Sequence, residues 1–476
     1  MRHLPRFVAL LAVAAATVTS TSGLASAATT ASVVTPVWGT YQTVAPARVL
    51  DTRYGTGAPK APVGAGRAID VPILGKGGVP ATGVSAVVLN MTATGATKGS
   101  YLTVWPAGTT RPTASSINFV ASASRANLVT VPLGTLGSGV GKISIFNQLG
   151  GVQVIADVMG YYLADGAATA GGLYQRITPE RSLDSRDPGF GGPFAPGEAI
   201  TVPVSYVDDS DPANIIDLDP HVVALAVNLT AVSPAKPGYL VSWAGSAPAP
   251  STSTLNFAAG TVTPNMAIVP VGPCTSCTGS WNGKPSITIL NQSAGSTHVL
   301  MDVVGFYDDG QIGDGLRFRP MAPTRIVDTR KGQGATTFPG KATRTVTAPV
   351  PVAGADTYSL VTNTTAVLPT LSTFLTLWDD AAVKPWVSNL NAAKGQTVAN
   401  ATITDVGAGN IFKIYNDRGA VNVLVDVMGT MEYVPNTAPV AAPLAAAARA
   451  AAPRAVATPR IFTANGAAEP VQRASR

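Results

Sequence analysis

The sequence predicts an all-β protein: three tandem β-sandwich-like or barrel-like repeat modules, followed by a disordered C-terminal tail. One set of motifs recurs three times along the 476 residues. Each copy holds about eight runs of about five to nine strand-forming residues, separated by turn-forming Gly and Pro. Charged residues make up only 12% of the chain, against about a quarter in typical soluble domains, so the charged residues that favour helices are scarce.

The chain is predicted to begin with a signal peptide over residues 1–27. Arg2 and Arg6 form a positive start, Phe7 to Ala16 is an apolar stretch, and Ala25-Ser-Ala27 is a small-residue cleavage site. This apolar stretch is too short to span a bilayer. We therefore expect a secreted, extracellular protein, either free or associated with the cell wall, and no transmembrane segment.

The spacing of the motifs sets the expected domain boundaries. A linker over 28–40 precedes the first module, and the modules cover 41–163, 174–307 and 317–433. The Ala-, Pro- and Arg-rich tail over 434–476 is predicted to be disordered, since its prolines prevent a continuous helix. The sequence leaves open whether the modules pack into one body or lie apart like beads.

Each module opens with the motif Arg-x-x-Asp-x-Arg, first seen as Arg48-Val-Leu-Asp51-Thr-Arg53. Each closes with a strand of the type Val-x-x-Asp-Val-x-Gly, such as Val154 to Gly160. We interpret these charges as a partly buried Asp–Arg cluster that joins the first strand of a module to its last. The repeated structural polar residues are Arg48, Asp51, Arg53, Asp157, Asp184, Asp302, Asp328 and Asp426.

Asparagine recurs inside one strand of each module, in the string Asn-x-Thr at Asn90, Asn228 and Asn363. The strings resemble glycosylation sequons. They lie in mid-strand, however, and we interpret them as polar contacts across strands.

An aromatic strand follows, first as Tyr101-Leu-Thr-Val-Trp105. In a strand, the first and last of these five residues point to the same face. If that face is exposed, the aromatic pair is a platform for a sugar ring. In the alternative interpretation, which we favour, the rings fill the core. The ligand-binding candidates are Tyr101, Trp105, Tyr239, Trp243, Phe374 and Trp378.

The segment from Arg48 to Tyr162 resembles a tandem all-β repeat module of secreted actinobacterial (Streptomyces-like) proteins. Five strings carry the resemblance: Arg48-Val-Leu-Asp-Thr-Arg53, Val88-Leu-Asn-Met-Thr92, Ala114-Ser-Ser-Ile-Asn118-Phe, Ala126-Asn127 and Ala156-Asp157-Val-Met-Gly-Tyr-Tyr162. Such modules occur in tandem or beside peptidoglycan-amidase or peptidase domains. The resemblance implies a secreted protein and attaches no biochemical role to the module. No amidase or peptidase domain accompanies the repeats here, so neither activity is carried over.

The net charge of +6 is a property of the leader and the tail. The repeats themselves are close to neutral and lack the basic stripe that nucleic-acid binding requires, so we predict no nucleic-acid partner.

The sequence contains two cysteines, Cys274 and Cys277, and an oxidising compartment favours a short loop disulfide between them. A loop of the middle repeat carries Asp208, Asp209 and Asp211, whose oxygens are the ligands that Ca²⁺ prefers. Their spacing fits no EF-hand, and we favour a solvated acidic loop, with no metal and no cofactor.

These features predict a secreted, non-catalytic repeat protein of the cell envelope that binds cell-wall or extracellular carbohydrate or an envelope protein. The alternative is an extracellular hydrolase of polysaccharide or peptide, because two of the repeated carboxylates would suffice for glycoside hydrolysis. The chain contains neither a Gly-x-Ser-x-Gly elbow nor a His-Glu-x-x-His string. We therefore assign no catalytic residue.

Overall fold

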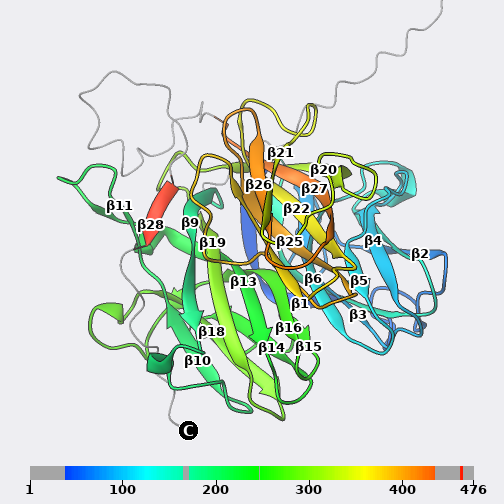
Figure 1. Cartoon of the computed structure of the whole chain (residues 1–476), viewed down its shortest axis with the longest axis horizontal. Coiled ribbons are helices and arrows are strands. Elements are labelled where there is room, and N and C mark those ends of the chain that lie inside the picture. Colours follow the sequence, from blue (N-terminus) through cyan, green and yellow to red (C-terminus); the bar gives the residue numbers. More distant parts are fainter. Residues whose placement is uncertain (1–37, 165–170, 246, 435–460, 465–476) are drawn as a thin grey trace, which may run out of the picture. The chain divides into compact units, whose positions relative to one another are not determined.

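The computed structural model describes residues 38–164, 171–245, 247–434 and 461–464 (Figure 1). These residues form β-strands with four single-turn 3-10 helices, Gly137–Gly139, Pro188–Phe190, Asp219–His221 and Gly279–Trp281. The prediction of an all-β fold is confirmed. Among the described residues, no helix has the length and apolar character needed to cross a membrane. The predicted signal peptide lies outside the described residues.

The first repeat supplies two four-stranded antiparallel sheets, with strand orders β1-β8-β3-β6 and β2-β7-β4-β5. Its strands are β1 (Tyr41–Asp51), β2 (Arg67–Pro72), β3 (Val84–Thr94), β4 (Ser100–Pro106), β5 (Ile117–Phe119), β6 (Arg125–Pro132), β7 (Lys142–Asn147) and β8 (Gln153–Leu163). The opening Arg-x-x-Asp-x-Arg motif lies at the end of β1, and the closing strand motif lies on β8 beside it.

The third repeat has the same topology, with orders β20-β27-β22-β25 and β21-β26-β23-β24. Its strands are β20 (Arg317–Asp328), β21 (Ala342–Thr347), β22 (Thr357–Val367), β23 (Thr373–Asp379), β24 (Leu390–Ala392), β25 (Thr397–Asp405), β26 (Ile411–Asn416) and β27 (Asn422–Glu432).

The second repeat adds strands to this plan. It contains β9 (Tyr174–Asp184), β10 (Ala199–Pro203), β11 (Tyr206–Asp208), β12 (Ile216–Asp217), β13 (Val222–Val232), β14 (Gly238–Ala244), β15 (Leu255–Phe257), β16 (Val262–Pro270), β17 (Gly272–Pro273), β18 (Pro285–Ser293) and β19 (His298–Asp308). The order β10-β18-β14-β15 repeats the second sheet, and the first sheet is extended to β12-β11-β28-β9-β19-β13-β16.

Strand β28 (Ile461–Ala464) comes from the C-terminal tail. It pairs in parallel with β9 and in antiparallel with β11, so it lies between them in the sheet (Figure 1). The prediction of a disordered tail is therefore wrong for these four residues, because a short β-prone run pairs with strand edges that would otherwise be open. The other residues of the tail beyond 434 lie outside the described residues.

The six small sheets are arranged as the blades of a β-propeller. Each sheet ends in a strand that contacts the end strand of the next sheet, and these contacts close a ring in the order β6, β5, β25, β24, β16, β15 and back to β6. The finer prediction, three tandem sandwich-like or barrel-like modules, did not include this arrangement. A sheet here packs against a sheet of the neighbouring repeat as well as against its partner in the same repeat.

An aromatic cluster lies in a hydrophobic core that takes side chains from all three repeats, and the second and third repeats each hold a further core of their own. Tyr162 of the first repeat stacks on Phe318 of the third, with 4.3 Å between ring centroids. Its hydroxyl lies 2.6 Å from that of Tyr307 in the second repeat. All three rings are fully buried, and such aromatic pairs contribute about 0.5–1.5 kcal/mol beyond their buried area. The repeats therefore form one body.

The glycine of the closing strand motif makes room for this cluster. A Cβ at Gly160 would lie 2.2 Å from the Tyr41 hydroxyl, and a Cβ at Gly305 would lie 2.2 Å from the Tyr174 hydroxyl. The aromatic ring of the opening strand thus crosses the closing strand where no side chain stands.

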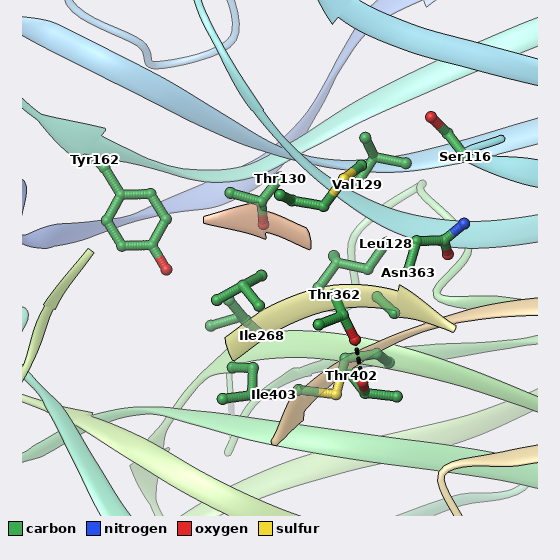
Figure 2. A pocket seen from close by; sticks show the side chains of 14 residues that line it. Ser116, Leu128, Val129, Thr130, Tyr162, Ile268, Thr362, Asn363, Thr402 and Ile403 are labelled. Atoms are coloured by element: carbon green, nitrogen blue, oxygen red, sulfur yellow. Dashed lines mark hydrogen bonds between the residues drawn. The ribbon is translucent and has the colours of Figure 1, made fainter. Parts of the chain in front are cut away.

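The centre of the ring is filled with side chains, most of them from β6, β16, β22 and β25 (Figure 2). The remaining cavity has a volume of about 10 Å³, which is room for about one water molecule. Thr362 and Thr402 face each other there, with 2.6 Å between their hydroxyl oxygens (Figure 2). The centre is therefore packed core and offers no space to a ligand.

One buried hydroxyl recurs without a partner in all three repeats. The threonines of the Asn-x-Thr strings, Thr92, Thr230 and Thr365, have no hydrogen-bond partner for Oγ1 among the described residues. Each is at most 3% exposed. An unsatisfied buried hydroxyl costs free energy of folding.

Replacing Thr230 with Val is therefore expected to raise the free energy of unfolding by about 1 kcal/mol, because the methyl group keeps the shape and removes the unpaired hydroxyl. Urea denaturation measures the change. Thr288→Val is the matched control and should destabilise, since that hydroxyl bonds with Thr201 at 2.8 Å and donates to the Gly245 carbonyl at 2.5 Å. Destabilisation by Thr230→Val would instead reveal a buried water bound to the hydroxyl.

Candidate functional site

Buried asparagines join each repeat to the next. At the junction of the first and second repeats (junction 1), Asn90 Nδ2 donates to the Ser253 carbonyl at 2.6 Å. Asn265 Nδ2 donates to Asn90 Oδ1 at 3.1 Å and to the Thr254 carbonyl at 2.6 Å. The prediction for Asn90 is a polar contact across strands. Its partners Ser253 and Asn265, however, belong to another repeat.

The same contacts recur at the other two junctions. Between the second and third repeats (junction 2), Asn228 Nδ2 donates to the Ser388 carbonyl at 2.8 Å, and Asn400 Nδ2 donates to Asn228 Oδ1 at 2.9 Å. Between the third and first (junction 3), Asn363 Nδ2 donates to the Ser115 carbonyl at 2.5 Å. The contacts therefore form a closed cycle around the three repeats.

The repeated arginines and aspartates meet beside these asparagines. In the first repeat, Arg48 Nε donates to Asp157 on β8 at 2.9 Å, and the Arg53 guanidinium donates to Asp51 at 2.7 Å. A further contact of 3.2 Å joins Arg48 to Asp51. The register of β1 on β8 places Arg48 directly opposite Asp157. The cluster thus ties the opening strand to the closing strand.

The clusters of the other repeats have the same form. In the second repeat, the contacts are Arg181 with Asp302 at 2.7 Å, Arg181 with Asp184 at 3.2 Å and Arg186 with Asp184 at 2.6 Å. In the third repeat, they are Arg325 with Asp426 at 2.8 Å, Arg325 with Asp328 at 3.7 Å and Arg330 with Asp328 at 2.7 Å.

The two carboxylates of each cluster differ in their titration. Burial raises the pKa of Asp157, Asp302 and Asp426, although the partner arginine opposes the shift. The hydrogen bond from the Arg330 side chain is the main cause that lowers the pKa of Asp328. In the first repeat, the side chains of Asp51 and Asp157 are each 1% exposed and both are bound to arginine. Neither is placed to reach a substrate.

A cleft of about 220 Å³ lies at junction 1, outside the buried asparagines. Its lining residues are Arg48, Arg53, Thr92, Thr94, Ser124 and Ile155 from the first repeat and Tyr239, Ser251, Ser253 and Asn256 from the second. The lining is mostly hydroxyl, amide and guanidinium groups with one tyrosine ring. Because Asp51 and Asp157 balance the two arginines, the local charge is close to neutral.

A serine orients an asparagine amide at the rim of the cleft. Ser253 Oγ donates to Asn256 Oδ1 at 3.2 Å, which turns the amide nitrogen away from the serine. The pairs Ser115–Asn118 and Ser388–Asn391 repeat the contact, each at 3.1 Å. The three amide nitrogens have no hydrogen-bond partner in the part of the chain that the structure describes. Each is therefore a free donor for a ligand.

The six aromatic candidates divide into two groups. The indoles of Trp105, Trp243 and Trp378 are each less than 10% exposed. Their Nε1 groups donate to carbonyls four residues later, at 3.0 Å to Thr109, 2.5 Å to Ala247 and 3.1 Å to Ala382. These hydrogen bonds hold the loop that follows the strand, and the buried rings expose no face to a ligand.

The other three aromatic candidates are partly exposed and lie at the rims. Tyr101, Tyr239 and Phe374 stand opposite the rim asparagines Asn118, Asn256 and Asn391 in the strand register. Tyr239 lines the cleft at junction 1. The aromatic strand therefore contributes its first residue to the junction and its last residue to the core.

Trp386 is not among the candidates that the sequence suggested. This indole is 96% exposed and precedes the rim residue Asn391 by five positions, as the cleft residue Ser251 precedes Asn256. The equivalent residue of the first repeat is Thr113. Since an indole shares no chemistry with the hydroxyls of Thr113 and Ser251, no repeated motif marks the position. Aligning the repeats on the rim asparagines would have found it.

The acidic loop of the second repeat is not assembled as a metal site. Across the described ranges, no group of three or more His, Cys, Asp or Glu side chains is placed to hold a metal ion. Asp208 and Asp211 each accept a bond from a backbone N–H two residues later, at 3.1 Å and 3.0 Å, and Asp209 is exposed. Asp208 is buried, so the loop is less solvated than expected.

The predicted disulfide between Cys274 and Cys277 is confirmed. It closes a short loop between β17 and β18, on the second sheet of the middle repeat.

Comparison with known proteins finds no family model and no curated protein that matches this chain.

Replacing Asn228 with Ala is expected to lower the free energy of unfolding by about 2–4 kcal/mol, because the Ser388 carbonyl and the Asn400 amide each lose a buried partner. Denaturant titration followed by circular dichroism measures the change. Asn214→Ala, at an exposed position of the same repeat, is the control and should change stability by less than about 0.5 kcal/mol. Equal effects of the two variants would contradict the structural role of the junction asparagines.

Replacing Asp328 with Asn is expected to destabilise the protein at pH 7 by about 2–4 kcal/mol, since two arginines lose their anionic partner. The folded pKa of Asp328 lies below its ordinary value. Its contribution is therefore present above the unfolded pKa of about 3.9 and is lost as the pH falls through the folded value. Unfolding measured from pH 7 to pH 2 should show the two proteins converging in acid, whereas the exposed Asp356→Asn should follow the parent throughout.

Proposed function

We propose that this protein is a secreted, non-catalytic repeat protein of the cell envelope that binds glycan in clefts at the junctions between its repeats. The three repeats then act as three related binding units, each junction combining the opening motif of one repeat with the aromatic strand of the next. The single observation that carries the proposal is the cleft at junction 1 and the chemistry of its lining.

The lining suits a neutral ligand rich in hydroxyl groups. Guanidinium and amide groups donate to sugar hydroxyls, serine and threonine hydroxyls both donate and accept, and the Tyr239 ring offers an apolar face to sugar C–H groups. The two arginines carry no excess charge because Asp51 and Asp157 neutralise them. A cleft of about 220 Å³ is smaller than a typical drug-sized pocket of about 300–1,000 Å³, which suits a short stretch of glycan.

A non-catalytic role is supported by the state of the repeated carboxylates. Glycoside hydrolysis needs one carboxyl group that reaches the glycosidic oxygen and another that reaches the sugar or a water. Asp51 and Asp157 are buried and bound to arginine instead. The hydrolase alternative would require both groups to leave these partners.

The ends of the sequence support the location. The signal-peptide features of residues 1–27 favour export, and the tail beyond 434 contains five arginines and one glutamate. A basic tail attracts anionic wall polymers by charge, and salt screens that attraction. Weak sites at several junctions would add avidity on a polymer with repeating units.

Co-sedimentation of the mature full-length protein with purified cell walls tests the proposal. Binding should survive high salt, since the clefts act through hydrogen bonds and ring contacts rather than net charge. The double variant Tyr239→Ala/Asn256→Ala should bind about tenfold more weakly or worse, because it removes one of the linked sites. Leu136→Ala, which removes an exposed apolar side chain that is not part of the cleft lining, should bind like the parent.

The tail is tested by changing its five arginines to glutamine rather than by truncation, because Ile461–Ala464 forms part of a sheet. This variant should keep its binding at high salt. Binding that disappears with salt or with the tail arginines, or that is indifferent to the cleft variant, would overturn the proposal.

A further inference from the structure

We infer that junction 2 holds a site for a neutral pyranose, and that Trp386 stacks on the apolar face of that sugar. The inference rests on the proposed function and deepens it by assigning the sugar class and the residue that recognises it. Its basis is the equivalence of junctions 1 and 2 together with one residue in which they differ.

The two junctions share their construction. Phe374 pairs with Asn391 in the register in which Tyr239 pairs with Asn256. Asn228 donates to the Ser388 carbonyl at 2.8 Å, as Asn90 donates to the Ser253 carbonyl at 2.6 Å. This equivalence places Arg181, Arg186, Phe374, Trp386, Ser388 and Asn391 around junction 2 as their counterparts stand around the cleft at junction 1.

Trp386 is presented to solvent by a fixed backbone. Its ring is 96% exposed, whereas the next residue, Val387, is 3% exposed. The Thr376 hydroxyl donates to the Val387 carbonyl at 3.0 Å, and Ser388 is held by Asn228. Large apolar groups gathered at the surface commonly mark a binding site. Two more apolar side chains stand at positions whose counterparts line the cleft at junction 1. Val262, which is 44% exposed, corresponds to Ser124, and the partly exposed Phe374 corresponds to Tyr239.

The chemistry of the junction selects the sugar. A pyranose whose hydroxyls are all equatorial exposes axial C–H groups on both faces of its ring, and these pack on an indole. Arg181 and Arg186 are balanced by Asp302 and Asp184, so a neutral sugar is favoured over an acidic one. The free amide nitrogen of Asn391 donates to a hydroxyl at the edge of the ring.

The experiment uses the full mature chain and soluble oligomers of β-1,4-linked N-acetylglucosamine, with β-1,4-linked glucuronate oligomers, which carry carboxylates, as the comparison. Calorimetry gives affinity and intrinsic fluorescence reports on the indole, since Trp386 is the most exposed tryptophan of the described residues. The parent should bind the glucosamine oligomers with a fluorescence change and bind the glucuronate oligomers at least fivefold more weakly, because the arginines of the junction carry no excess charge. Trp386→Ala should lose at least tenfold in affinity, and Trp386→Phe should lose less.

Val383→Ala is the matched control, because Val383 is 91% exposed on the same loop and should not affect binding. Unchanged affinity in Trp386→Ala, or equal affinity for the two sugars, would overturn the inference. Concentration-dependent self-association that Trp386→Ala abolishes, without sugar binding, would also overturn it and assign the indole to a protein interface. Wall binding through junction 1 persists in all of these cases, and its absence in the parent would count against the proposed function instead.

Discussion

The structure depends on the hydrogen bonds that buried asparagines make from one repeat to the next. Asn90, Asn228 and Asn363 are each 2% exposed and donate to backbone carbonyls of a different repeat. A repeat on its own would leave these amides and carbonyls without partners, at a cost of about 1–3 kcal/mol for each group that stayed buried. Each repeat thus needs both of its neighbours, and a cycle of three satisfies every one of them. Because each repeat supplies two sheets, a closed cycle of three repeats gives six blades around a packed centre.

The same contacts build the candidate site. Each asparagine that joins two repeats also sets the opening motif of one repeat beside the aromatic strand of the next. The cleft at junction 1 lies just outside that contact and takes its lining from both repeats. The Arg48–Asp157 pair serves both purposes, since it fixes β1 on β8 and exposes part of its guanidinium to the cleft. The proposed binding site and the contacts between repeats therefore share one surface.

Local patterns in the sequence predicted the strands, the disulfide and the residues of the charge clusters, because these interactions join residues within one repeat. The role of Asn90 could not be predicted, since its partner Ser253 belongs to another repeat. Alternation placed Tyr101 and Trp105 on one face, yet the ends of a strand can differ in burial, and only the tyrosine is at a rim. Trp386 stands where the other repeats have Thr113 and Ser251, so no repeated motif marked it. Strand β28 pairs with an edge created by the β11 insertion, which the tail itself does not encode.

The three junctions differ at rim positions that take no part in the hydrogen bonds between repeats. The asparagines that join the repeats, the rim serines and the arginine–aspartate clusters within each repeat are the same in all three. Each rim has one partly exposed aromatic residue and one exposed loop residue. These are Tyr239 and Ser251 at junction 1, Phe374 and Trp386 at junction 2, and Tyr101 and Thr113 at junction 3. No packing constraint on the described residues accounts for an indole at one rim and small hydroxyls at the others. Under the proposed function, unlike ligand preferences at the three junctions would account for it, and a chain with three unlike junctions would suit a polymer whose successive units are not identical.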